Sequence, residues 1–192
     1  MTALAKVKIK IDGIGYFHNP DWEETNMFFS LTMAREWLLS EICIVCYSDI
    51  VYQPSAVRKL MEDDSDLAIT YYTDFWQLWS KRFVNPLDDL ETFKLDGERL
   101  VEIGGKPESK GDIHGQYMGL LRFTPAGWRV VEQAVKLPMP KPVEKLDMTA
   151  LLQHLLIQGH SISAIPSGGL WLECDNLEDI RVYEREFRVN PL

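Results

Sequence analysis

The stretch Ile42-Cys43-Ile44-Val45-Cys46-Tyr47, followed directly by Ser48-Asp49, decides the fold class of this chain. A continuous apolar run that ends abruptly at a charged residue is typical of a strand buried on both faces of a mainly parallel sheet. Ligands of such sheets gather at the carboxyl ends of the strands, so Asp49 is a candidate ligand-binding residue. A turn or helix-cap aspartate is an equally good interpretation of this segment alone.

Helices and strands are predicted to alternate on both sides of this stretch. Before it, residues 6–11 alternate as a half-exposed strand does, and apolar residues at helical spacing predict a helix over 26–39. After it, a helix leads to a strand over 67–72, which makes a β-α-β unit. Further on, the patterns predict a hairpin over 93–95 and 100–103, strands over 117–123 and 161–165, and helices over 125–134, 147–158 and 177–187. The alternation predicts an α/β fold with helices packed against a mixed sheet.

Composition narrows the class of protein. The 192 residues, 46% hydrophobic and 26% charged, fit one globular domain. The net charge of -9 argues against a nucleic-acid partner, because phosphate backbones are bound by clustered Lys and Arg. No apolar run reaches the roughly 18 residues of a membrane span, so we expect a soluble cytoplasmic protein with no membrane partner. The three cysteines are interpreted as small buried hydrophobic residues.

A second group of acidic residues lies near the C-terminus, in Trp171-Leu172-Glu173-Cys174-Asp175. In an extended stretch, Glu173 and Asp175 point to the same side. Carboxylates that arrive from separate strand ends could hold one Mg²⁺, which prefers hard oxygen ligands. The alternative for Asp175 is that it caps the helix that follows.

Several short motifs occur in an order and at a spacing that resemble a known family. They are Asn19-Pro20, Thr25-Asn26, Ser30-Leu31, Tyr47-Ser48-Asp49-Ile50, Arg82-Phe83 with Pro86-Leu87, Ile103-Gly104, Gly115-Gln116-Tyr117, Asp147-Met148-Thr149, and Trp171-Leu172-Glu173 with Asp175. Over about residues 16 to 185, the chain resembles the small-molecule cytidylyltransferases related to phosphocholine and 2-aminoethylphosphonate cytidylyltransferases.

The resemblance implies a three-layer, nucleotidyltransferase-like fold of the GT-A or Rossmann-like kind, as one domain over residues 1–192. It implies Mg²⁺-dependent attack of a phosphate or phosphonate oxygen on the α-phosphorus of CTP, with release of pyrophosphate. Such chemistry depends on positioning and on neutralisation of charge. Asp49 and Asp175 match the family's metal-binding aspartates and are the expected catalytic residues, and Glu173 joins them as a metal ligand.

Six residues are expected to contact substrate: Asn26, Trp76, Lys81, Arg82, Gln116 and Asp147. Trp76, Lys81 and Arg82 offer an aromatic wall and positive charge for a small substrate. Taken individually, each of these three fits a packing or surface residue better than a substrate contact. Gln116 resembles part of the family's acceptor pocket. Asn26 and Asp147 have helix capping as their alternative role.

The chain departs from the family at its N-terminus. Relatives begin with a strand that runs into a glycine-rich loop, followed by a basic residue and a Pro-Lys pair, and none of these elements precedes Asn19. Gly104-Gly105-Lys106-Pro107 lacks the spacing of a phosphate-binding loop. We therefore expect an N-terminally truncated form of the fold, an unpaired sheet edge and weak binding of CTP by this chain alone.

Three explanations of this departure stay open: a truncated gene product, half of a split enzyme completed by a complementing N-terminal chain, and a diverged fold in which residues 1–15 replace the lost strands. A homodimer is a further possibility for the assembly. The alternative functions are a non-catalytic interaction module and a sugar-1-phosphate nucleotidyltransferase.

Overall fold

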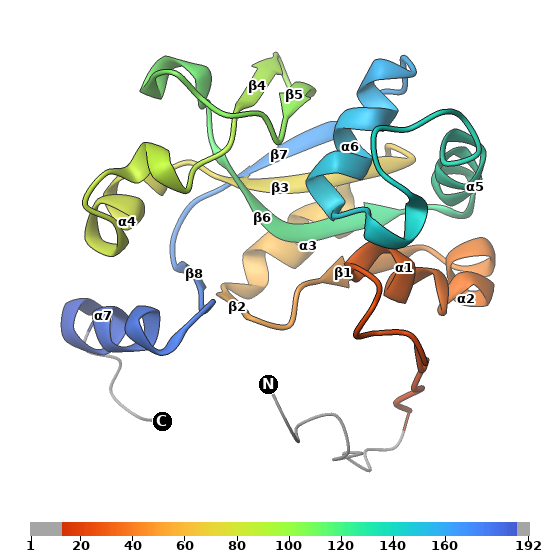
Figure 1. Cartoon of the computed structure of the whole chain (residues 1–192), viewed down its shortest axis with the longest axis horizontal. Helices are drawn as coiled ribbons and strands as arrows, with labels where there is room; N and C mark the ends of the chain where they lie inside the picture. The colour runs from red at the N-terminus through yellow and green to blue at the C-terminus, as the bar shows by residue number, and fades with distance from the viewer. Residues whose placement is uncertain (1–12, 188–192) are drawn as a thin grey trace.

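A computed structural model describes residues 13–187 and shows a mixed sheet with helices packed against it (Figure 1). In the order in which they pair, the strands of the six-stranded sheet are β1 (Cys43–Cys46), β6 (Gln116–Phe123), β3 (Leu67–Tyr72), β7 (Ser163–Ser167), β5 (Arg99–Ile103) and β4 (Phe93–Asp96). Two short strands, β2 (Ile50–Tyr52) and β8 (Trp171–Glu173), form a separate ladder. The predicted α/β class is confirmed, whereas the strand predicted over 6–11 lies outside the described residues.

The direction of the strands places three chain segments at one edge of the sheet. β1 and β3 both run antiparallel to β6, so they are parallel to each other, and β7 is parallel to β3. The carboxyl ends of β1, β3 and β7 therefore meet at the same edge. The segments that follow these ends carry Asp49, Arg82 and Glu173.

The prediction that the apolar run at β1 is buried on both faces was wrong. Cys43, Ile44 and Val45 are only half-buried, Cys46 is exposed, and Ile42 just before the strand is 58% exposed. β1 is also an edge strand, paired only with β6 among the described residues. Its open side borders a groove of about 820 Å³, which is also lined by Phe17, Leu31 and Trp37. An apolar run shows that side chains meet apolar surface, but it does not show whether a strand lies on each side.

The helices largely follow the predicted periodicity. They are α1 (Met27–Thr32), α2 (Arg35–Ser40), α3 (Pro54–Glu62), α4 (Phe75–Arg82), α5 (Pro125–Ala134), α6 (Met148–Ile157) and α7 (Leu177–Phe187), with short 3-10 turns at Pro86–Asp88, Lys110–Asp112 and Val143–Lys145. The helix predicted over 26–39 is divided in two at Met33 and Ala34. None of the described helices combines the length and the apolar character that crossing a bilayer requires.

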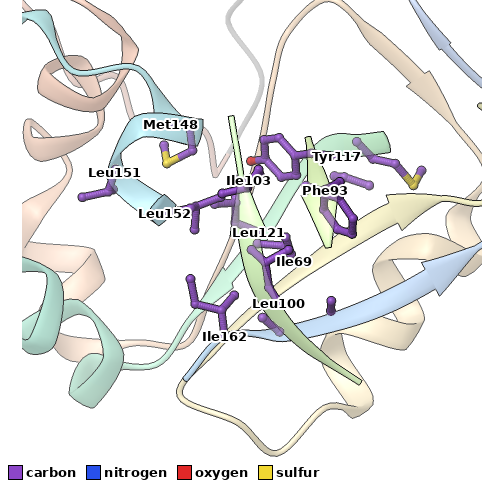
Figure 2. Packing of buried hydrophobic residues seen from close by; sticks show 14 of the residues in the cluster. Ile69, Phe93, Leu100, Ile103, Tyr117, Leu121, Met148, Leu151, Leu152 and Ile162 are labelled. Atoms are coloured by element: carbon purple, nitrogen blue, oxygen red, sulfur yellow. The ribbon is translucent and has the colours of Figure 1, made fainter. Parts of the chain in front are cut away.

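The main core lies between α6 and the sheet. In Figure 2, Met148 and Leu152 of α6 lie beside Ile103 of β5, and all three are buried. Asp147 caps α6, since its carboxylate accepts a hydrogen bond of 2.7 Å from the Ala150 N–H. The buried apolar surface of α6 fixes this helix, so the position of Asp147 at its N-terminus is fixed as well.

Gly127 in α5 provides a test of how closely this fold is packed. A Cβ at Gly127 would overlap the backbone carbonyl oxygen of Asp66, so α5 would have to move. We expect Gly127→Ala to lower the free energy of unfolding by about 1 to 3 kcal/mol despite the better helix propensity of alanine. Urea denaturation measures the change. Gly111→Ala is the control, because its Cβ would meet only the Ser109 hydroxyl at an ordinary 3.4 Å; equal stability of both variants would contradict the prediction.

Candidate active site

The ladder between β2 and β8 joins the two acidic segments of the sequence. Ile50 pairs with Glu173, and the N–H of Cys174 donates to the carbonyl oxygen of Asp49 at 2.8 Å. Asp49 therefore lies opposite Cys174, whose neighbours in the chain are Glu173 and Asp175. The sequence had suggested that these carboxylates arrive from separate strand ends, and the structure shows how the backbone brings their segments together.

A buried arginine lies behind these carboxylates. The Arg82 side chain, at the end of α4, is only 1% exposed. Its Nη2 lies 2.7 Å from Asp175, its Nε lies 2.9 Å from Asp179, and its Nη1 lies 3.5 Å from Glu173. Burial alone would lower the pKa of Arg82, but the hydrogen bond to Asp179 and the other carboxylates raise it above its usual range. The guanidinium is therefore held in its charged form.

Stacked aromatic rings support this ion cluster. The Arg82 guanidinium lies 5.0 Å from the centre of the Trp79 ring, and Trp79 stacks on Trp171 of β8 at 5.6 Å. The indole N–H of Trp171 donates to the Met118 carbonyl in β6 at 3.2 Å. The small ladder is thereby fixed to the central sheet, because Trp171 is buried between the two.

Glu173 is the carboxyl group whose titration the site perturbs most. Burial, together with the negative charges of Asp175 and Asp49, raises the pKa of Glu173 to about 7 against the opposing effect of Arg82. Since one guanidinium does not balance these carboxylates, a cation at their exposed side would stabilise the ionised form.

Asp49 and Asp175 fit a magnesium ion that carboxylates and substrate phosphates hold together. Within residues 13–187, no cluster of three His, Cys, Asp or Glu side chains forms a ready-made metal cage. Magnesium, however, is usually held by one or two carboxylates together with substrate phosphates. Asp49 is exposed and the Asp175 side chain is 48% exposed, so both can reach such a ligand.

A pocket of about 450 Å³ lies along α6, from Asp147 at its N-terminus to Ile157 at its end. Its charged lining residues include Glu91, Glu102, Lys141 and Asp147. Burial raises the pKa of the Glu91 carboxyl. Burial alone would also raise the pKa of Asp147, but Lys141, at 2.9 Å, and the Ala150 N–H hold it below its usual value. Carboxylates outnumber the lysine, so the pocket favours a ligand with positive charge.

Tyr47, directly after β1, is half-buried and packs against Tyr117, with ring centroids 5.9 Å apart. Burial raises the pKa of the Tyr47 phenol, and Asp147, Glu173 and Glu91 raise it further. The phenol is therefore within electrostatic reach of both groups of carboxylates. Gly119 has a φ of +73°, and a Cβ there would lie 2.8 Å from the Tyr47 ring, so only glycine leaves room for this tyrosine.

The other residues expected to contact substrate occupy several places, and their substrate contacts stay predictions. Asn26 caps α1, since its side chain accepts from the Met27 N–H at 2.9 Å. Trp76 is half-buried, with the Lys110 ammonium 4.7 Å from its ring centre. Lys81 is exposed on α4, next to the buried Arg82. Gln116 begins β6 and pairs with Tyr72 at the end of β3.

Sequence reasoning missed three residues of this region. Glu91 and Lys141 lie in connecting segments, where no periodic pattern marks a residue as lining a pocket. Asp179 is an acidic residue in the first turn of α7, a common position for an exposed charge, yet its side chain is 6% exposed and binds Arg82. A buried charge cannot be distinguished from an exposed one in the first turn of a helix until its partner is known.

Comparison with known proteins identifies the family. No family model matches the chain. The CTP:phosphoglutamine cytidylyltransferase of Campylobacter jejuni is 32% identical over 185 residues, which cover 90% of this chain and 73% of that protein. This chain belongs to the cytidylyltransferases. The resemblance seen in the motifs is confirmed, and with it the assignment to the nucleotidyltransferase class of enzymes.

Solved structures support the same fold for this cytidylyltransferase. The inositol-1-phosphate CTP transferase from T. maritima matches with a TM-score of 0.63 at 19% identity, over 91% of this chain and 66% of that one. The nucleoside-diphosphate-sugar pyrophosphorylase from Vibrio cholerae RC9 matches with a TM-score of 0.52 at 13% identity, over 83% and 64%. The cytidylyltransferase chain thus spans about two thirds of the length of these structures.

The raised pKa of Glu173 predicts how stability depends on pH. Between the ordinary pKa of 4.5 and the folded value of about 7, the unfolded chain loses this proton and the folded chain keeps it. The free energy of unfolding should therefore fall as pH rises through this window, by up to about 3 kcal/mol, and level off above it. Urea denaturation in EDTA measures the decline. Glu173→Gln should remove it and exposed Glu178→Gln should keep it; the same decline in both variants would contradict the assignment to Glu173.

Proposed function

We propose that this cytidylyltransferase transfers CMP from CTP to a small, amine-bearing phosphate or phosphonate in a magnesium-dependent reaction. The observation that supports this proposal is the β2–β8 ladder, which brings Asp49, Glu173 and Asp175 together at the carboxyl edge of the sheet. The Campylobacter relative is named for CTP and phosphoglutamine, which makes a phosphorylated amino compound the first acceptor class to test.

The three carboxylates have a common role in this proposal. Asp49 and Asp175 would hold Mg²⁺ with Glu173 beside them, and the bound ion would neutralise charge on the triphosphate. With a net charge of -9, the chain otherwise repels a polyanion, so local positive charge is a requirement of nucleotide binding.

The reaction in this proposal is a single displacement. An oxygen of the acceptor's phosphate or phosphonate forms a bond to the α-phosphorus of CTP, and the bond from that phosphorus to the pyrophosphate oxygen breaks. Pyrophosphate leaves, and the chain itself forms no covalent intermediate. The protein contributes in-line positioning, which is the principal source of catalysis in phosphoryl and nucleotidyl transfer.

The pocket beside α6 is the proposed binding site for the acceptor. Its volume of about 450 Å³ suits a small metabolite, and Glu91 and Asp147 provide negative charge for an ammonium group. Tyr47 lies within electrostatic reach of both the pocket and Glu173. An acceptor with its amine at Asp147 would direct its phosphate toward the carboxylates of the ladder, where CTP must bind.

Pyrophosphate release tests the proposed activity. Millimolar CTP and Mg²⁺ are combined with phosphoglutamine, phosphocholine, 2-aminoethylphosphonate or a hexose 1-phosphate, and a coupled assay measures pyrophosphate. We expect turnover with an amine-bearing acceptor and at least a 100-fold loss of kcat in Asp49→Asn, because a metal ligand loses its charge. Asp64→Asn is the control and should keep full activity, because this exposed aspartate follows α3 and is not part of the proposed site. Absence of CTP-dependent turnover in the wild type, or full activity of Asp49→Asn, would reject the proposal.

Asp147→Asn tests the acceptor pocket separately. Asparagine caps a helix as well as aspartate does, so α6 should remain folded while the pocket loses one negative charge. We expect the KM for the amine-bearing acceptor to rise about tenfold, with kcat nearly unchanged, since a lost charge contact of this size costs about 1.4 kcal/mol. Glu144→Gln, an exposed change three residues away, is the control. An unchanged KM in Asp147→Asn would show that the amine binds elsewhere.

A further inference from the structure

The proposed function uses Asp49, Glu173 and Asp175, but it leaves the most buried charges of the region unexplained. Asp179 on α7 and Arg82 on α4 have side chains that are 6% and 1% exposed. Burial of charged groups is costly unless each finds partners. Neither residue lines the 450 Å³ pocket, so their contacts within the chain indicate their role.

Asp179 holds the backbone next to the acidic motif. Its Oδ2 accepts hydrogen bonds from the N–H groups of Asp175 and Asn176, at 3.0 and 3.1 Å. Its Oδ1 accepts from Nε of Arg82 at 2.9 Å. A carboxylate with these three donors has a single well-defined orientation, and it fixes the turn that carries Asp175.

Arg82 fixes Asp179 in turn. Its guanidinium lies against the rings of Trp79 and Phe83, with centroid distances of 5.0 and 5.1 Å. From this position Nη2 also reaches Asp175 at 2.7 Å. Figure 1 shows α4 and α7 at the same end of the molecule, and their contact includes this ion pair.

The acidic motif needs such support because its own secondary structure is short. The ladder of β2 and β8 has only three residue pairs, and it ends at Glu173. Residues 175–178 are exposed, so packing does not restrain the Asp175 side chain. Groups behind the ligands commonly fix the orientation of a cation site, and their loss typically weakens metal binding by about 10- to 100-fold.

We propose that Arg82 and Asp179 are positioning residues that hold Asp175 and Glu173 in place opposite Asp49 for cation binding. The inference rests on the proposed function for the identity of the site. It assigns Arg82 a structural partner within the chain in place of the substrate contact that the sequence suggested. Neither residue touches the cation or the nucleotide in this proposal.

The direction of the change in cation affinity distinguishes a positioning role of Arg82 from simple charge compensation. Arg82 carries a positive charge next to the proposed ligands, so its removal would tighten cation binding if the charge were all that mattered. If Arg82 holds the ligands in place, its removal weakens cation binding. Asp179→Asn and Glu178→Gln form a matched pair, because adjacent residues on α7 each lose one negative charge and only Asp179 binds Arg82.

Terbium luminescence provides the probe, with Tb³⁺ as a stand-in for the hard divalent cation and with Trp171 and Trp79 as sensitising chromophores. In the full chain, we expect at least tenfold weaker Tb³⁺ binding in Arg82→Gln and in Asp179→Asn, partial recovery in Arg82→Lys and no change in Glu178→Gln. Arg35→Gln removes a more exposed ion pair, between Arg35 of α2 and Glu132 of α5 at 2.5 Å, and is the control for loss of an arginine elsewhere in the fold. Tighter or unchanged binding in Arg82→Gln or Asp179→Asn would overturn the proposal.

Hydrogen–deuterium exchange keeps the two proposals distinguishable. The Cys174 N–H, bonded to the Asp49 carbonyl, should exchange faster in Arg82→Gln and Asp179→Asn but not in Glu178→Gln or Arg35→Gln. If wild-type protein binds no Tb³⁺, the cation site of the proposed function fails, and the exchange of Cys174 still decides whether Arg82 and Asp179 fix this segment. Exchange equal to wild type in both variants would refute the positioning role.

Discussion

A guanidinium that is almost completely buried among carboxylates constrains the whole functional end of this molecule. Arg82 cannot leave water without partners, and Asp175, Asp179 and Glu173 supply them from β8 and α7. The same side chain lies on Trp79, which stacks on Trp171. The end of α4 and the segment of β8 and α7, which are 93 residues apart between Arg82 and Asp175, are therefore held together, because separating them would leave a buried charge unpaired.

The central sheet determines where this cluster can act. Parallel β1, β3 and β7 end at one edge, and each is followed by a segment of the site: Asp49 after β1, α4 after β3 and β8 after β7. An acidic site in an acidic chain can bind a triphosphate only if a cation adds positive charge. The proposed function therefore combines a magnesium ion with CTP and the acceptor.

Much of the fold could be predicted from periodicity, and the exceptions have physical causes. α5, α6 and the hairpin of β4 and β5 were found where apolar spacing and turn residues indicated them. β2 was missed, because three residues are too few to show an alternation. The edge position of β1 was missed as well. Its apolar side chains face a groove on the open side, which gives the same composition as a strand between two neighbours.

The α/β class, the family and the acidic motifs could be inferred from the sequence alone, since they depend on residue order and local spacing. The tertiary structure shows which of those residues lie close together. It placed Asp49 opposite Cys174 between two acidic side chains, turned Arg82 inward and joined Glu91 and Asp147 in one pocket. The physical reason is that burial and pairing of charge depend on neighbours distant in the chain, and no local pattern records them.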